Sequence, residues 1–541
     1  MEDNTLSSST HQMGELSNCE LNSQKHQAHP PGIHCDTFAG LVHVEWDDQA
    51  PVTPIGQLVF FAQFLKTCNL FAPWVNDCPL HYSSPNAPSK EDVLGTLLLA
   101  VLSGQKRYAH ITSIRQDTVN PALLGMKRVL SEDSARRAFQ KTDEEACKKW
   151  QQKHLEACYD SLLLEEWILD VDTTVKPLYG HQEGAEVCYN PSKHGRPAHV
   201  IHTYSMAETR LILDAEVLAG TQQAATYSLP RLIEIVDELP LEKKPSLIRG
   251  DCAFGNEKVL SPLEARNLGY LFKVKLTKRA KSLTRFVMDT VNDWADAGQG
   301  WEGVESILRL SGWTKERRVI ILRRKVKEKK SKKMTKEEQM NFPFLAFMPK
   351  SDEYEFAVLI TTLEMDILTI AQLYRDRATS ENHFDELKRQ WGWGGFVTQD
   401  LKRSQIMVRI NAQIYNWWTL FVRWINPEKH AEAITSRPLM LYGVAVESNH
   451  AGQKTIRITP MHGKAKENSE KVSFISSILN KIKSVAERFS PSEIWKRVLS
   501  MIFVKFLKGK ILGEGHWGEE WCKSEGLIDF VGPPNMAVQI T

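Results

Sequence analysis

The stretch YRDRATSENHFDELK, residues 374–388, has the composition of a charged helix, but its side chains keep an unusual spacing. At about 100° per residue, five of them project along one narrow polar stripe: Tyr374, Arg377, Glu381, Asp385 and Lys388. A solvated helix with an i,i+4 ion pair would look the same. However, WGWGG and an apolar helical segment follow directly. We therefore expect this helix to lie beside a core.

Upstream of this helix, the hydrophobic pattern alternates as in β-strands. The sequence WILDVDTT, residues 167–174, places Asp170 and Asp172 on one face of a strand. Two like charges there repel, and a bound cation would relieve the repulsion. We expect further strands at 198–204, 210–218, 247–251, 270–276 and 356–362, with helices near Ser228 and after Asp251. This order predicts an α/β fold, a mixed sheet flanked by helices, built from residues 161–280 and 346–430.

Residues 281–345 interrupt that pattern and predict a β-strand insertion. Within it, residues 315–333 carry 11 Lys or Arg against two Glu, the composition of an electrostatic DNA contact. Trp301 and Trp313 precede this basic run. Each could stack on an unpaired or flipped base, although a place in the core is the alternative for both.

The flanking regions are less specific. Residues 1–50 predict a disordered polar tail; His26, His29, His34 and Cys35 could bind a metal ion there, the alternative being loose histidines. Residues 51–160 predict an N-terminal helical domain with Ser89 as a helix N-cap. With Arg136 and Arg137 on its last short helix, it is either a DNA-binding domain or a helical subdomain without a ligand. Residues 431–541 are assigned a possible role in dimerisation.

Composition narrows the class of protein. The chain has 541 residues, with 68 Lys plus Arg against 66 Asp plus Glu, so any DNA contact must come from local clusters. Its nine cysteines form no CxxC pair, which favours reduced thiols. No apolar run is long enough for a membrane span, and the first residues lack the pattern of a signal peptide. We expect a cytoplasmic protein with no membrane partner.

Three acidic residues suggest catalysis: Asp172 on a first strand, Asp251 at the end of a later strand, and Glu381 on the helix quoted above. Acids delivered this way can meet at one edge of a sheet. Such ligands suit Mg²⁺ or Mn²⁺. Two of these ions can activate a water or a 3′-hydroxyl and stabilise the leaving oxygen, which is phosphoryl transfer on a nucleic-acid backbone.

Four residues of the stripe, Tyr374, Arg377, Glu381 and Lys388, reproduce the Y-x2-R-x3-E-x6-K signature of DDE transposases from bacterial insertion sequences. LDVDTT resembles the first-aspartate strand of that superfamily, and IRGDCAFGNE its second-aspartate turn. VCYNPSKHGRP resembles a loop of its insertion sequence 1380-like branch, although Cys188 replaces the usual glycine. The likeness runs from about residue 55 to 430.

The resemblance implies a ribonuclease-H-like catalytic core interrupted by a β-strand insertion. It implies that Asp172, Asp251 and Glu381 bind two Mg²⁺ or Mn²⁺ ions. It also implies that DNA phosphates are contacted by Tyr374, Arg377 and Lys388.

We also expect specific roles for several residues near these motifs. Asp172 is preferred to Asp170 as the metal ligand, because the family places a small hydroxyl residue directly after its aspartate. Asp385 is expected to form a salt bridge with Lys388 or Arg389 rather than to bind metal. DNA contacts are also expected near the first acid, at Lys193, His194 and Arg196.

The resemblance implies a transposase that binds terminal inverted repeats in double-stranded DNA. It would cleave each end through a hairpin and transfer it to target DNA within a homodimeric synaptic complex. Two alternatives are a chain that only binds DNA and a host nuclease on the same fold. The retained acids disfavour the first, since carboxylates repel phosphate, and the Tyr-Arg-Glu-Lys arrangement disfavours the second.

Overall fold

The computed structural model describes residues 32–190, 193–325, 354–427, 430–484 and 486–512, and within one helix it leaves the side chains of residues 379–381 undescribed. The chain divides into two units, residues 1–51 and 52–541. Each is considered by itself.

The first unit contains a β-hairpin where a disordered tail was expected. Strand β1 (Ile33–Thr37) pairs antiparallel with β2 (Gly40–Val44), so the expectation is wrong for this segment. The hydrophobic alternation of residues 33–44 is short and lies within a polar segment, so it is a weak signal for strands. The rings of His34 and His43 contact each other at 3.2 Å. His26 and His29 lie outside the described residues.

Residues 52–163 form the helices that the sequence predicts. Ser89 is confirmed as an N-cap, because its hydroxyl accepts from the backbone N–H of Asp92 at 3.1 Å. Arg136 and Arg137 are both ion-paired with Asp133. The helices are α2 (Leu58–Thr67), α3 (Phe71–Asp77), α4 (Lys90–Leu102), α5 (Val119–Leu123), α6 (Glu132–Arg137) and α7 (Glu144–Tyr159), with the 3-10 helices η2 (Tyr108–Ile114) and η3 (Asp160–Leu162).

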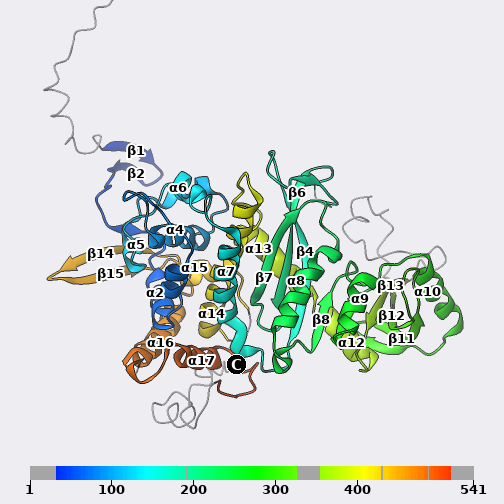
Figure 1. The fold of residues 1–541 in the computed structure, drawn as a ribbon. Helices are drawn as coiled ribbons and strands as arrows, with labels where there is room; N and C mark the ends of the chain where they lie inside the picture. Colours follow the sequence, from blue (N-terminus) through cyan, green and yellow to red (C-terminus); the bar gives the residue numbers. More distant parts are fainter. Residues whose placement is uncertain (1–31, 191–192, 326–353, 428–429, 485, 513–541) are drawn as a thin grey trace, which may run out of the picture. The chain divides into compact units, whose positions relative to one another are not determined.

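A mixed sheet forms the centre of the second unit (Figure 1). Its first part consists of β4 (Ile168–Pro177), β5 (Glu186–Val187), β6 (Pro197–Met206), β7 (Ile212–Ala219), β8 (Leu247–Gly250) and β9 (Tyr270–Lys273). Strands β7, β6 and β4 are antiparallel neighbours, whereas β4, β8 and β9 run parallel. Helix α8 (Ala225–Glu238), 3-10 helix η4 (Leu241–Lys243) and helix α9 (Glu257–Glu264) lie between the strands in sequence.

The predicted insertion contains strands, but they extend this same sheet. Helix α10 (Lys278–Thr290), which the sequence analysis missed, precedes β10 (Ala295–Gly298), β11 (Trp301–Leu308) and β12 (Arg317–Lys325). Strand β13 (Tyr354–Thr361) then joins β12 to β9, with Ile360 opposite Phe272. The order of the strands is β10-β11-β12-β13-β9-β8-β4-β6-β5, and β7 also pairs with β6.

The quoted stretch 374–388 is not one continuous helix. Helix α12 (Ile367–Arg375) ends and α13 (Ala378–Gln390) begins around Asp376 and Arg377. At this junction the Arg377 N–H bonds the Tyr374 carbonyl three residues back, at 3.2 Å. Tyr374 and Glu381 therefore belong to different helices, and the expectation of a single stripe on one helix is wrong.

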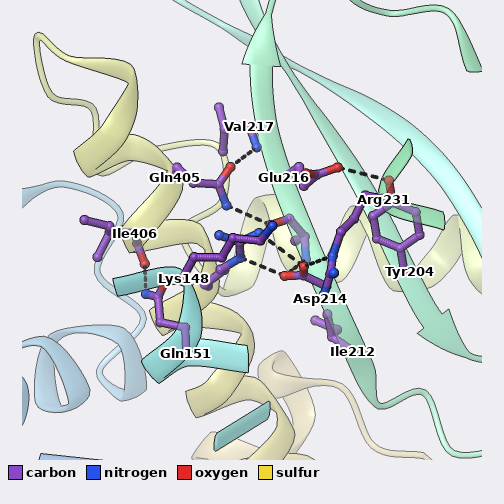
Figure 2. A network of polar contacts seen from close by, with 12 residues as sticks. Lys148, Gln151, Tyr204, Ile212, Asp214, Glu216, Val217, Arg231, Gln405 and Ile406 are labelled. Carbon is purple, nitrogen blue, oxygen red and sulfur yellow. Dashed lines mark hydrogen bonds and ion pairs between the residues drawn. The ribbon is translucent and has the colours of Figure 1, made fainter. Parts of the chain in front are cut away.

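Helix α14 (Leu401–Ile425) is buried along almost its whole length. Trp417 contacts Trp74 of α3, with ring centroids 5.2 Å apart. A buried charge network attaches α14 to the sheet (Figure 2). In it, Asp214 of β7 accepts from Arg409 of α14 and from Arg231 of α8, both at 2.7 Å. Because Asp214 is fully buried, two guanidinium partners offset its desolvation.

The C-terminal region packs against the N-terminal helices of the same chain. Ser476 donates to Gln63 of α2 at 2.6 Å, and Trp495 lies beside Phe64. A role in dimerisation stays a prediction. The elements are α15 (Ala433–Met440), β14 (Val444–His450), β15 (Gln453–Thr459), α16 (Ala465–Ser484), the 3-10 helix η5 (Ala486–Arg488) and α17 (Pro491–Ile502), and β14 pairs with β3 (Val52–Thr53).

Two other expectations concern the described residues. The cysteines among them are free thiols. In these ranges no single helix is long and apolar enough to cross a membrane; α2 and α3 pass only as a pair bent by 70°.

Candidate active site

Two adjacent parallel strands bring two of the predicted acids to the same level. In the register of β4 with β8, Asp170 lies opposite Arg249. Two residues further along are Asp172, within β4, and Asp251, directly after the end of β8. Parallel pairing of β4 with β8 therefore places these two acids at the same level of neighbouring strands.

Asp170 forms a buried ion pair with Arg249. Its two carboxylate oxygens accept from Nε and Nη2 of Arg249 at 2.7 and 2.8 Å, and both residues are buried. Arg249 also donates to the Leu373 carbonyl at 2.6 Å. The pair therefore fixes the end of α12 against the sheet, directly before Tyr374, and supports the preference for Asp172 as the ligand.

Asp172 is ion-paired with the guanidinium of Arg377. Arg377 is only 5% exposed, and Asp172, Tyr374 and Asp251 are all within its electrostatic reach. The pKa of Tyr374 is raised, by burial and also by the charges of Asp251 and Asp172, although Arg377 opposes the shift. Tyr374, Arg377, Asp172 and Asp251 therefore lie close together.

Asp251 lies in the turn between β8 and α9. Its carboxylate accepts from the backbone N–H of Ala253 at 2.8 Å, and Asn256 caps α9 by accepting from Val259. The predicted strand near 247–251 and the predicted helix after Asp251 are confirmed, and the Asn256 cap is an additional finding. The turn leaves the Asp251 side chain at the carboxyl end of β8.

Glu381 lies on α13, about one helical turn after Arg377, but its side chain is outside the described residues. Its convergence with the two aspartates therefore stays a prediction. Among the described residues no group of three or more His, Cys, Asp or Glu side chains could hold a metal. The two aspartates supply oxygen donors of the kind that hard divalent cations prefer, and both act on the charge of Arg377.

Lys388 lies two turns beyond Glu381 on α13. It is half-buried, and burial lowers its pKa, while Asp385 acts in the opposite direction. Asp385 pairs with Arg389 at 2.7 Å, which confirms the expected salt bridge.

The structure separates two tryptophans of the insertion, Trp301 and Trp313. Trp313 is 5% exposed and belongs to the core, with the Arg317 guanidinium over its ring. Trp301 is half-buried at the start of β11, and the exposed Arg324 lies over its ring, 4.8 Å from the ring centroid. Trp301 is therefore the more accessible of the two.

The arginines in the described part of the basic run are ion-paired. On β12, Arg317 pairs with Glu257 and Glu264, Arg318 with Glu305, Arg323 with Glu302, and Arg324 with Glu355. Lys325 is exposed at the end of β12, and the electrostatic DNA contact stays a prediction. The remaining lysines, at 327–333, lie outside the described residues.

A second cationic cluster stands at the far end of the β4–β6 hairpin. Lys193, His194 and Arg196 are exposed. The Lys193 ammonium and the Arg196 guanidinium lie 5.9 and 4.7 Å from the ring centroid of Tyr179, which is 68% exposed. Tyr179 was missed by sequence reasoning, because no local pattern connects it with a loop 14 residues later.

Lys176 was also missed. It is 2% exposed on β4, and it donates to the Gly395 carbonyl in the WGWGG turn at 2.5 Å. Burial lowers its pKa to about 7. The contact links the strand of Asp172 to the segment that follows α13. A lysine within an apolar strand pattern was the available signal.

Comparison with known proteins places this geometry in a family. The family model described as transposase DDE domain group 1 matches residues 83–444, more than half of the chain. No curated protein matches significantly. A solved structure titled as the piggyBac transposase synaptic complex with hairpin DNA is 13% identical over 71% of this chain and 80% of that chain, and its TM-score of 0.35 establishes no shared fold. The chain belongs to the transposase DDE domain group 1 family.

Proposed function

We propose that this transposase mobilises a bacterial insertion sequence from the cytoplasm, acting on the nucleoid. In this proposal it binds terminal inverted repeats, and Asp172, Asp251 and Glu381 direct metal-dependent DNA cleavage and strand transfer. The observation that carries it is the placement of Asp172 and Asp251 at one level of parallel strands, beside Arg377. The strand order β7-β6-β4-β8-β9 is the basis for assigning a ribonuclease-H-like core.

The residues divide into two roles. Asp172, Asp251 and Glu381 would hold two Mg²⁺ or Mn²⁺ ions, which supply Lewis acidity and an activated oxygen nucleophile when bound. Tyr374, Arg377 and Lys388 would bind phosphates next to the scissile bond, with Arg377 offering a bidentate fork. Because these three residues lie on the α12–α13 segment, they would hold the DNA strand next to the acids.

Further DNA contacts extend along the sheet. At about 3.3 Å per residue, the end of β4 at Pro177 lies roughly 16 Å beyond Asp172, a span of about five base pairs, and Tyr179 follows it. Lys193 and Arg196 would contact backbone phosphates there. On the opposite arm of the sheet, Trp301 would stack on an unpaired base. The acting form would be a homodimer, since synapsis joins two ends.

Purified full-length protein tests the proposal with a duplex that carries one inverted-repeat end and either Mg²⁺ or Mn²⁺. The wild type should cleave the end, and Glu381→Gln should abolish cleavage while end binding remains. Asp385→Asn is the matched control on the same helix, because it removes an exposed ion pair, and it should cleave normally. A folded wild type that binds the end but never cuts it would contradict the proposal and favour a chain that only binds DNA.

A further inference from the structure

We propose that Arg377 is the internal counter-ion of the acidic site, and that its transfer from Asp172 to a DNA phosphate couples DNA-end binding to loading of a divalent cation. The inference rests on the proposed function. It adds that the two binding events are cooperative, and it assigns a second task to one of the phosphate-binding residues.

The Arg377 side chain is buried. The guanidinium of Arg377 is removed from water and pairs with the Asp172 carboxylate. Arginine cannot lose its proton in a protein, so a buried guanidinium requires an anionic partner in every state of the site. In the state described here, Asp172 provides that partner.

Arg377 and a divalent cation compete for the carboxylate oxygens of Asp172. A divalent cation on Asp172 needs carboxylate lone pairs that the Arg377 guanidinium now uses. Asp172, Asp251 and Arg377 together carry a charge of −1. A divalent cation changes that sum to +1, and one phosphate returns it to zero. Counting Glu381 lowers each of these sums by one, so each binding event still changes the charge of the site by the same amount.

The position of Arg377 between two helices is the third feature that supports the proposal. Arg377 lies at the break between α12 and α13, where it is the N-cap residue and no carboxylate or hydroxyl of its own closes the helix end. In the proposed rearrangement the Arg377 side chain rotates towards the DNA while both helices stay formed. A DNA phosphate is, like the Asp172 carboxylate, an anionic bidentate partner for the guanidinium, so DNA binding would release the Asp172 oxygens and raise the affinity of the acids for metal. By reciprocity, metal would tighten DNA binding by the same factor.

The test measures Mn²⁺ affinity of the full chain from the electron paramagnetic resonance signal of free Mn²⁺, with and without a pre-cleaved end duplex. For the wild type, DNA should tighten Mn²⁺ binding by about tenfold. In Arg377→Gln without DNA, Mn²⁺ should bind about tenfold tighter than in the wild type, and DNA should add little. Arg389→Gln, on the same helix but exposed, should behave as the wild type.

If the Arg377→Gln variant folds poorly, the Arg377→Lys variant can be tested instead. Thermal melting shows whether each variant is folded. Lysine keeps the charge but lacks the fork, so its Mn²⁺ affinity should lie between those of the wild type and Arg377→Gln. Mn²⁺ should raise the Tm of each variant more than that of the wild type. Folded variants that bind Mn²⁺ no tighter than the wild type would overturn the inference even if the wild type cuts DNA. A wild type that neither binds Mn²⁺ with DNA nor cuts it would instead remove the proposed function.

Discussion

Arg249 holds both carboxylate oxygens of Asp170, although the two residues are 79 positions apart in the chain. The contact joins β4 to β8 at the level just before the two candidate metal ligands. Because Arg249 also reaches the Leu373 carbonyl, one guanidinium positions two strands and the end of α12. Asp170 therefore supports the site without belonging to the metal-binding set.

Asp170→Asn should destabilise the fold by about 3–5 kcal/mol, because it leaves a buried arginine without its charged partner. Urea denaturation followed by circular dichroism measures the change in unfolding free energy. Asp385→Asn, which breaks an exposed pair, should cost less than about 1 kcal/mol. An Asp170→Asn variant as stable as the wild type, but with weaker Mn²⁺ binding, would make Asp170 a ligand instead.

Trp301 and Trp313 of the insertion should respond differently to truncation. Trp313→Ala should cost about 3–5 kcal/mol of unfolding free energy, because it empties a core site. Trp301→Ala should cost much less, but it should weaken binding to an end with unpaired bases by about 1–3 kcal/mol. Denaturation and fluorescence anisotropy measure the two effects. Equal DNA affinity for Trp301→Ala and the wild type would remove Trp301 from the interface.

The hairpin cluster should contribute to the salt dependence of DNA binding. Each lost phosphate contact lowers the slope of log K against log salt by about 0.9, so Lys193→Gln with Arg196→Gln should lower it by roughly 1.8. Titrations of a long end duplex at several salt concentrations give this slope. A duplex cut short before the hairpin should show no difference, and a difference there would place the two residues elsewhere on the DNA.

Stability should rise with pH because of Lys176. Burial lowers its pKa from 10.5 to about 7, so between these values the unfolded chain carries a proton that the native chain lacks. Stability from this residue therefore increases from about pH 7 towards pH 10 and is lost as the pH falls through 7. Denaturation midpoints at several pH values should show this rise in the wild type and a smaller one in Lys176→Met. Parallel curves for the two proteins would contradict the assignment.

Most strands and helices of the core could be predicted because local patterns specify them. WILDVDTT alternates as a half-buried strand does, and IRGDCAFGNE contains its own turn and cap residues. The partners of β12 could not be predicted, since Glu257 and Glu264 lie on α9 and Glu355 lies on β13, all distant in sequence from the arginines they pair with. The break at Arg377 was also not predicted, and Arg377 there pairs with Asp172, which is 205 positions away.

The continuity of β10 to β13 with β9, β8 and β4 in one sheet has a practical consequence for anyone trimming this protein. Deleting residues 281–345 would remove β12 and uncover the backbone N–H and C=O groups of β13, a long apolar strand whose neighbour had shielded it. Bare edges of that kind recruit other chains. A shortened protein would therefore precipitate through edge-to-edge association before its chemistry could be assayed, whereas point substitutions within the segment would leave it soluble.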